Sequence, residues 1–361
     1  MTDRPPISAS ETAELLDPAL RDDDHAVLQL HDRDLTQIDW HEPLIEQAVL
    51  VDVDIGQVTC EGGTLRDVRF ERAMFGGVTI RQTTFENVTF DQCELNLSIV
   101  NGEFRGCTFI HCTFHQVVSR STAFHACSWE GGEVGAWLGT EDRWDEVVVE
   151  GSSLAGGTFS NVIWCRTQWI NAKLIGIQST GCNYYDVSFH GSEIADCEWL
   201  IGEWIGTSFR TCTIYSNRWL QIEVKKSMWT ECKEMTDLNW VGCDIDSWSL
   251  VDSSVHNLRV AGGSLRDAEW TRALLIEVWL DGIPLSMVRW TDLEFEGLAI
   301  TRVKAQGLVL AKVIAREHVH VQHSSFAHYE ATDCQRESGT DLLLEGVTYT
   351  ASPSNWSDWN A

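Results

Sequence analysis

The chain contains 361 residues, 43% of them hydrophobic, which is enough for a substantial core in one elongated domain or in two ordinary ones. It carries 54 acidic and 26 basic residues, a formal net charge of −28. This balance argues against direct nucleic-acid binding, because phosphate neutralisation requires clustered Lys and Arg. It suits a protein that meets a basic partner surface.

The first twenty residues, MTDRPPISASETAELLDPAL, lack the basic and apolar stretches of a secretory signal, and no later run is apolar enough to span a bilayer. We therefore expect a cytoplasmic protein without membrane contact. Twelve cysteines in so long an intracellular chain are not expected to form a disulfide framework. No CxxC pair is present, so a structural zinc site is not expected either.

Residues 1–30 precede the regular part of the sequence and are predicted to form a small N-terminal cap. Ser8 and Glu11 have the spacing of a capping box, in which each side chain satisfies a backbone N–H of the other residue. This predicts a short helix over residues 11–16 that ends near Pro18.

From residue 35 onward an apolar residue returns every five positions. We call this residue the centre, i; the centres occupy the ranges 35–100, 104–234 and 240–310, with one residue lost at the first junction and one gained at the second. Of these 56 centres 52 are apolar, far above the 43% background. The four exceptions are Ser119, Gly139, Ser179 and Glu234.

The position two residues before each centre, i−2, is small or β-branched, and the positions between are mainly polar. Nine of the twelve cysteines occupy it. They are Cys93, Cys107, Cys112, Cys127, Cys182, Cys197, Cys212, Cys232 and Cys243. A thiol there is predicted to face the core as a small hydrophobe, which raises its pKa and makes it inert.

Geometry turns this pattern into a fold. In an extended segment residues i−2 and i point to one side, but a centre five residues later would point to the opposite side. A helix advances about 500° in five residues and scatters the centres around its axis. All centres can share one core only if the chain turns a corner in every unit.

The number of faces per turn follows from a step of twenty residues. Phe104, Phe124, Trp144 and Trp164 form one column of like residues, and Phe109, Trp129, Val149 and Trp169 form another. A step of fifteen mixes residue classes. Each coil is therefore predicted to have four faces.

This repeat resembles the pentapeptide-repeat family, whose unit is a small residue, a polar residue, a Leu or Phe centre and two variable positions. The resemblance covers about residues 35–310. It implies an all-β fold, a right-handed quadrilateral β-helix of about 14 coils with small caps at both ends. The predicted parts are an N-terminal cap at 1–30, the β-helix at 31–315 and an irregular C-terminal cap or tail at 316–361.

The sequence departs from the family pattern in two ways. Eleven of the 17 tryptophans occupy centres, where the family uses Leu or Phe. Because each buried indole N–H needs an acceptor, we expect local widening of the coil or rings that swing outward. After residue 283 the i−2 position also becomes large, so the coils are expected to be least regular there.

Three tryptophans are the candidate partner-binding residues. Trp137 lies out of frame in GAWLGTEDR, residues 135–143, which is predicted to loop out from a corner. Trp356 and Trp359 lie in the tail, which ends in WSDWNA.

No arrangement of residues predicts a metal, a cofactor or catalysis. His318, His320 and His323 form HVHVQH, but no Cys or carboxylate in the sequence pattern completes a ligand set. The acidic residues Glu193, Glu198 and Glu203 lie on successive faces and should point apart, which does not suit acid–base catalysis. No P-loop, GxSxG or dinucleotide motif is present, so the chain is not expected to be an enzyme.

We expect a protein-binding scaffold that uses its outer faces. Long arrays rich in Cys and Trp are similar to the pentapeptide-repeat proteins found beside spike and adaptor components of bacterial type VI secretion systems. The resemblance implies an adaptor or accessory protein that helps to assemble a spike or to load an effector. Such a protein could leave the cell through a contractile system without a signal peptide.

Two alternatives remain open. Some family members are acidic rods that mimic DNA and protect DNA gyrase, and the net charge of −28 fits this role; those relatives are dimers, so this chain could also form a homodimer. The charge could instead keep a Trp-rich rod soluble. The second alternative is an effector or toxin whose active part is the tail from residue 316.

Overall fold

The structure, a computed structural model, describes residues 4–16 and 27–350. The chain divides into two compact units, Met1–Ile177 and Gln178–Ala361. Within each unit the fold is a parallel β-helix of four-sided coils, and the two units together comprise about 16 turns. The predicted fold class is confirmed, with two turns more than the 14 expected from the regular repeats.

The first unit begins with a capped helix, α1 (Ala9–Leu16). The Ser8 backbone N–H donates to Glu11 Oε2 at 2.9 Å, and the Glu11 N–H donates to Ser8 Oγ at 3.2 Å, which confirms the predicted capping box. A hydrogen bond from Arg33, together with those from Ser8, lowers the pKa of Glu11 to about 2. The predicted stop at Pro18 lies outside the described residues.

Short strands follow the helix along the coils of the first unit. They are β1 (Leu28–His31), β2 (Leu44–Val51), β3 (Thr59–Glu61), β4 (Thr64–Glu71), β5 (Met74–Arg81), β6 (Thr84–Glu86), β7 (Thr89–Asp91), β8 (Glu94–Val100), β9 (Glu103–Arg105), β10 (Thr108–Ile110), β11 (Thr113–Arg120), β12 (Ala123–His125), β13 (Ser128–Glu130), β14 (Glu133–Thr140), β15 (Arg143–Asp145), β16 (Val148–Glu150), β17 (Ser153–Ala155), β18 (Thr158–Ser160), β19 (Ile163–Cys165), β20 (Gln168–Ile170) and β21 (Lys173–Ile175).

The second unit is built from strands of the same kind. They are β22 (Gln178–Tyr185), β23 (Ser188–His190), β24 (Glu193–Ala195), β25 (Glu198–Ile205), β26 (Ser208–Arg210), β27 (Thr213–Lys225), β28 (Met228–Thr230), β29 (Glu234–Val241), β30 (Asp244–Asp246), β31 (Ser249–Val251), β32 (Ser254–Ala261), β33 (Ser264–Arg266), β34 (Glu269–Thr271), β35 (Leu274–Asp281), β36 (Pro284–Ser286), β37 (Arg289–Thr291), β38 (Glu294–Thr301), β39 (Lys304–Gln306), β40 (Val309–Ala311), β41 (Ile314–Gln322), β42 (Ser325–Ala327), β43 (Glu330–Thr332), β44 (Gln335–Arg336), β45 (Asp341–Glu345) and β46 (Thr348–Thr350).

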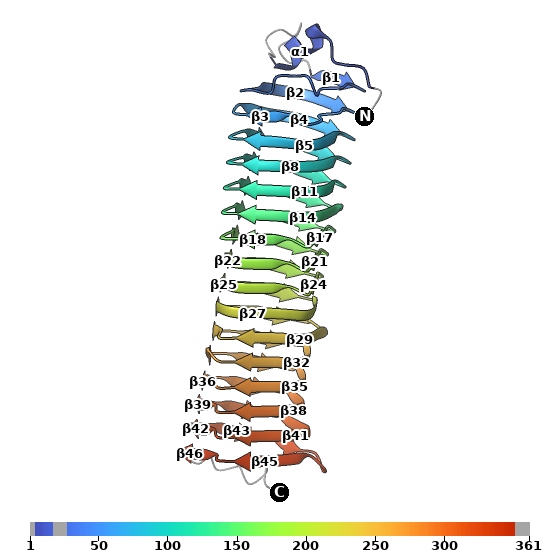
Figure 1. The fold of residues 1–361 in the computed structure, drawn as a ribbon. Helices are drawn as coiled ribbons and strands as arrows, with labels where there is room; N and C mark the ends of the chain where they lie inside the picture. Colours follow the sequence, from blue (N-terminus) through green and yellow to red (C-terminus); the bar gives the residue numbers. More distant parts are fainter. Residues whose placement is uncertain (1–3, 17–26, 351–361) are drawn as a thin grey trace. The chain divides into compact units, whose positions relative to one another are not determined.

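Each strand pairs in parallel with the strand one coil away, as the ribbon shows within each unit (Figure 1). In the first unit Phe124 pairs with Trp144 and Trp144 with Trp164, so the predicted twenty-residue column is confirmed. In the second unit Tyr184 pairs with Trp204, again twenty residues apart. Most corner residues adopt the left-handed conformation, with φ near +50° to +60° for non-glycine residues, which turns the chain between successive centres.

Aromatic centres stack along the interior of both units. In the first unit Phe90, Phe109 and Trp129 stack with ring centroids 4.9 and 4.7 Å apart. In the second unit Trp219 and Trp240 stack at 4.3 Å with their planes 6° apart. Each such contact adds about 0.5–1.5 kcal/mol to the free energy gained by burying the rings.

Of the two outcomes expected for the tryptophan centres, a widened coil or outward rings, the outward rings are wrong. All eleven are buried, and they are Trp129, Trp144, Trp164, Trp169, Trp199, Trp204, Trp219, Trp229, Trp240, Trp270 and Trp290. Several of their N–H groups, among them those of Trp144, Trp240 and Trp270, make no hydrogen bond. Burying a ring of about 150–250 Å² therefore outweighs the cost of about 1–3 kcal/mol for an unsatisfied indole N–H.

The structure moves both predicted changes of frame by one unit. The four-residue step lies before Ile99, which is buried in place of the predicted centre Val100. The six-residue step lies before Met235, which is buried while the predicted centre Glu234 is exposed. The first error arose because Val100 is apolar and fits the old frame. The second arose because Cys232 fits the i−2 position of the old frame, although Glu234 is not apolar.

The predicted boundaries of the β-helix at 31 and 315 are too narrow. Strand β1 pairs with β2 from Leu28 onward. At the other end β41 to β46 continue the ladder through Thr350, although one extra residue shifts the frame near residue 317. The large i−2 residues after 283 are buried, and the pairings β35–β38, β36–β39 and β37–β40 stay in register. The expected irregularity appears between β38 and β41, where the register shifts beside Gly297.

No helix within residues 4–16 and 27–350 combines the length and the apolar character needed to cross a bilayer.

Candidate interaction surfaces

The predicted loop around Trp137 does not exist. Residues 135–140 belong to β14, and the Trp137 side chain is 2% exposed. The side chain turns inward because the neighbouring centres, Ser119 and Gly139, are small and leave space in the core. Its Nε1–H donates to Ser119 Oγ at 2.8 Å. Trp137 therefore presents no surface to a partner.

The buried carboxylate of Asp142 joins Trp137 and Ser119 in a hydrogen-bonded cluster inside the first unit. Ser119 Oγ donates to Asp142 Oδ2, and the Thr122 N–H donates to Asp142 Oδ1 at 2.9 Å. Burial raises the pKa of Asp142 to about 6, although both hydrogen bonds act to lower it. The cluster is an internal polar network in the place of an apolar centre.

The other two predicted partner-binding residues, Trp356 and Trp359, lie outside the described residues.

The cysteines at i−2 are buried, as predicted, but they also serve as hydrogen-bond donors. Cys107 Sγ lies 3.4 Å from the Phe85 carbonyl and Cys112 Sγ 3.3 Å from the Phe90 carbonyl, each in the preceding coil. Ser152 and Asn217 make the same kind of bond, to the Gly131 and Ile194 carbonyls. This explains why Cys, Ser and Asn share a position that size alone would give to Ala.

The expected rise in thiol pKa is seen at several of these residues, but it is wrong for Cys112, Cys127 and Cys232, where the hydrogen bond with the stacked cysteine lowers the pKa. Burial raises the pKa of Cys243 to about 11. The pKa of Cys107 and Cys212 is raised first by the hydrogen bond to the cysteine stacked on each and then by burial.

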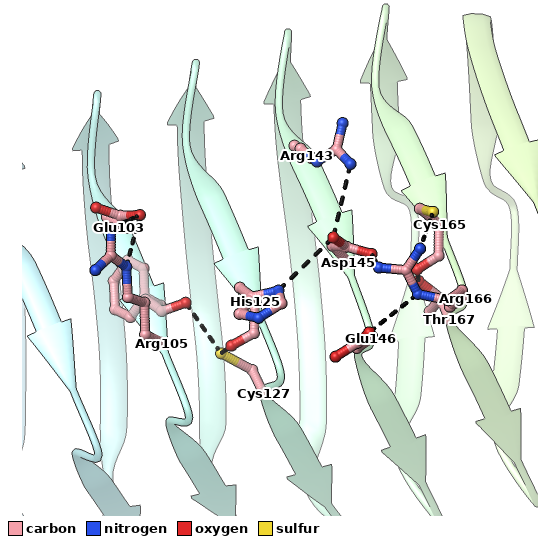
Figure 2. A network of polar contacts seen from close by, with 11 residues as sticks. Glu103, Arg105, His125, Cys127, Arg143, Asp145, Glu146, Cys165, Arg166 and Thr167 are labelled. Carbon is pink, nitrogen blue, oxygen red and sulfur yellow. Dashed lines mark hydrogen bonds and ion pairs between the residues drawn. The ribbon is translucent and has the colours of Figure 1, made fainter.

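Charged residues form a compact cluster around Asp145 on the outside of the first unit (Figure 2). Arg166 Nη2 lies 2.5 Å from Asp145 Oδ1, while Arg143 Nη2 and His125 Nδ1 lie 3.6 and 3.7 Å from Asp145 Oδ2. Arg166 also contacts Glu146 at 3.1 Å. These cationic groups already bind carboxylates of their own chain, so the cluster joins adjacent coils rather than offering a free anion site.

Cys165 is the one cysteine that is not buried, and it gives a direct test of the fold. Arg166 Nη1 lies 3.3 Å from its sulfur, but burial and then the charge of Asp145 raise its pKa. We expect a native protein to react with a thiol reagent at about one thiol, slowly at pH 7 and faster at higher pH, and at all twelve after denaturation. Mass mapping should place the native adduct on Cys165, and Cys165→Ser should abolish it; rapid labelling of Cys107 or Cys243 would contradict the buried arrangement.

A groove of about 640 Å³ runs along one edge of the second unit, and we call it the edge groove. Its lining comprises Gly181, Asn183, Ile201, Gly202, Glu203, Gln221, Ile222, Glu223, Gly242 and Asp244. One wall is acidic because Glu203, Glu223 and Asp244 pair in register in successive coils. Gly202 adds no side chain to this lining, and a Cβ there would lie 2.1 Å from the Cys182 carbonyl oxygen, so a larger residue does not fit.

Ile201 projects beside this groove in a strained conformation. It has φ +52°, a left-handed corner that disfavours β-branched residues, and its side chain is 56% exposed. The neighbouring corner residues of the same column, Gly181 and Gln221, do not hide it. Neither the corner nor the core requires isoleucine here, so the residue is a candidate contact for a partner.

Ile201 was not among the predicted partner-binding residues, although the sequence carries a signal for it. It lies at i+2 from the centre Trp199, a position that elsewhere carries mainly Gly, Asp, Asn or other polar residues. An isoleucine in a corner position is the departure from pattern that could have identified it.

The carboxylates of Glu193, Glu198 and Glu203 accept hydrogen bonds from different neighbours. Tyr215 donates to Glu193 at 2.7 Å, Arg218 donates to Glu198 at 3.2 Å, and Tyr185 donates to Glu203 at 2.9 Å. Each carboxylate therefore has its own structural partner.

No protein-family model matches the chain, and no curated protein sequence matches it. Among solved structures, a trypsin-treated variant of QnrB1, a plasmid-mediated fluoroquinolone resistance protein, shares 15% identity over 54% of this chain and 84% of its own, with a TM-score of 0.27. The siphovirus 9NA tailspike receptor-binding domain shares 10% identity over 85% and 73%, with a TM-score of 0.28. HetL, a pentapeptide-repeat protein involved in heterocyst differentiation regulation in the cyanobacterium Nostoc, shares 11% over 86% and 88%, with a TM-score of 0.12.

These likenesses are too distant to carry a conclusion about function. The architecture of the fold follows from the five-residue repeat of the sequence and from the twenty-residue register of the ladders. By its repeat and its four-sided coils, the chain has the architecture of a pentapeptide-repeat protein.

Proposed function

We propose that the chain is a non-enzymatic protein-binding scaffold, and that it acts as an adaptor or accessory protein of a larger bacterial assembly such as a type VI secretion spike or an effector-loading complex. The observation that carries this proposal is Ile201, an exposed β-branched residue held in a left-handed corner beside the edge groove. Strain that serves neither the core nor the turn supports a role in contact with a partner.

The chemistry of the edge groove indicates what kind of partner segment it accepts. An apolar side chain can pack on Ile201, which is 56% exposed, and a Lys or Arg side chain can reach the carboxylate of Asp244. Glu203 already accepts from Tyr185, and Glu223 is paired with Lys225 at 2.5 Å. An extended segment that alternates apolar and basic residues satisfies both walls.

The proposal predicts a separation of stability from binding at Ile201. Ile201→Asn should leave the fold at least as stable, because Asn tolerates the left-handed conformation, and it should weaken partner capture about tenfold or more. Met287→Asn is the matched control, since Met287 is also an exposed apolar corner residue with φ +55° in the same unit. Affinity capture from the native host, with mass spectrometry and quantitative binding of the captured protein, measures the effect.

A partner retained by the wild type and by Met287→Asn but lost by Ile201→Asn supports the proposal. Equal capture by both variants would remove the edge groove from the proposal, and the absence of any stoichiometric partner would remove the adaptor role.

DNA mimicry is the second candidate, supported by the net charge of −28. It predicts inhibition of gyrase supercoiling that fades steeply as salt rises, because the contacts would be ionic and screened. Several carboxylates are already paired with cations in neighbouring coils, as Asp252 is with Arg272 at 2.7 Å, and this pairing reduces the free negative charge.

A further inference from the structure

Strand β41 contains one more residue at a corner than β38, the strand with which it pairs in the preceding coil. Ile276 pairs with Glu296 and Val278 with Leu298, so one residue lies between the pairs on each strand. In the next step Glu296 pairs with Arg316 but Leu298 pairs with Val319. Two residues, Glu317 and His318, therefore lie opposite Gly297. A bulge of this kind redirects side chains.

Gly297 opens the space into which His318 turns. A Cβ on Gly297 would lie 2.8 Å from His318 Cε1 and 3.1 Å from Glu277 Oε1. The imidazole and the Glu277 carboxylate thus meet over the backbone of the intervening coil. A Cβ at this corner would require the imidazole or the carboxylate to move.

Three metal-ligating side chains converge at this point, one from β35 and two from β41. One carboxylate oxygen each from Glu277 and Glu317 and one imidazole nitrogen of His318 lie within 4.8 Å of one another. His318 Nε2 and Glu277 Oε2 are 3.9 Å apart. Zinc bound at about 2.0–2.1 Å in tetrahedral geometry holds its ligand atoms roughly 3.4 Å apart. Side-chain rotations that move the ligand atoms by about 1 Å would therefore bring them to these distances.

The surrounding charged groups leave this cluster free for a cation. Arg316, the nearest arginine in sequence, is directed to Glu294 at 2.7 Å and Glu337 at 2.8 Å. His320 contacts Asp341 at 3.0 Å. Within residues 4–16 and 27–350, the ion pair of this cluster is the one between His318 and Glu277, and no arginine or lysine pairs with Glu277 or Glu317.

We propose that Glu277, Glu317 and His318 form a binding site for a divalent transition-metal ion of the zinc class, which bridges the β35 and β41 coils. A nitrogen ligand with two carboxylates favours such an ion over calcium or magnesium, which prefer oxygen ligands. Three protein ligands leave one coordination position for water.

The test uses the full chain, freed of metal by a chelator and desalted, and zinc titrated by calorimetry with magnesium and calcium in parallel. One zinc site is expected, and His318→Ala or Glu277→Gln should weaken it about tenfold or more. Gly297→Ala should have a similar effect without altering a ligand, because the new methyl group displaces the imidazole; since alanine at φ +94° is also strained, the stability of this variant is compared with that of the wild type. His190→Ala, an exposed histidine of the same unit, is the control and should bind zinc as the wild type does.

Histidine-labelled protein provides a second readout, in which zinc should shift the His318 imidazole resonances and leave those of His190 unchanged. Circular dichroism confirms that each variant is folded before titration. The proposal is overturned if the wild type binds no zinc, or if the His318→Ala variant binds zinc as tightly as the wild type. It is also overturned if calcium binds more tightly than zinc and independently of His318.

Discussion

Replacing Trp240 by alanine is expected to lower the free energy of unfolding of the second unit by about 3–5 kcal/mol, the usual cost of removing a fully buried large aromatic. The ring stacks on Trp219 at 4.3 Å and lies 5.8 Å from Trp229 and 5.7 Å from Trp248. Its removal leaves a cavity that no neighbouring ring can fill without breaking its own stack. Denaturant unfolding followed by circular dichroism measures the loss.

Two further variants show whether packing is the cause. Trp240→Phe should cost much less than the alanine variant, because Phe keeps the stack and removes an indole N–H that has no hydrogen-bond partner. Trp279→Ala, at a tryptophan that is 37% exposed, should cost about 1 kcal/mol or less. Equal losses for the alanine variants at 240 and 279 would argue against the aromatic interior.

Asp142→Asn is expected to stabilise the first unit at pH 8 and to change little at pH 4. Burial raises the pKa of Asp142 from 3.8 to about 6, so the folded state holds the proton more tightly than the unfolded chain does. The stability that this carboxyl contributes is full below pH 3.8 and is lost as the pH rises through 6. Two pKa units correspond to about 3 kcal/mol, so the variant should gain about 2–3 kcal/mol at pH 8.

The hydrogen bonds of Asp142 explain why asparagine is the right replacement. Asn keeps the acceptor for the Thr122 N–H and offers an N–H to Ser119, as a protonated carboxyl would offer its O–H. Thermal unfolding from pH 4 to pH 8 measures the effect, with Glu133→Gln as a control of equal charge change at an exposed site. A variant whose gain over wild type does not depend on pH would show that Asp142 is charged in the native protein.

The four-sided coil could be predicted because it follows from one rule that holds at almost every unit. Large side chains at a spacing of five can share a core only if the chain turns between them, and the step of twenty then gives the number of faces. The same rule fails where a residue at another position of the unit fills the core in place of the centre. Trp137 fills the core from i−2 because the centre Gly139 cannot, and a pattern of centres alone predicts a loop there.

The proposed sites depend on relations that the repeat does not encode. His318 approaches Glu277 because a bulge adds one residue and because the corner between them is glycine, and neither fact is visible in a histidine-rich string. Ile201 was hidden for the opposite reason, since its apolar character looks ordinary until its corner position is known. Departures from the repeat, rather than the repeat itself, mark the residues with a candidate role.

The one-residue changes of frame before Ile99, before Met235 and near residue 317 bear on how such a gene can evolve. In an ordinary sheet the loss or gain of one codon inverts every side chain that follows along the strand. Here a corner absorbs the change, and the next centre again faces inward. Single-codon insertions and deletions at corners should therefore survive selection in this lineage, and the array can lengthen, shorten and drift in phase while its interior stays intact.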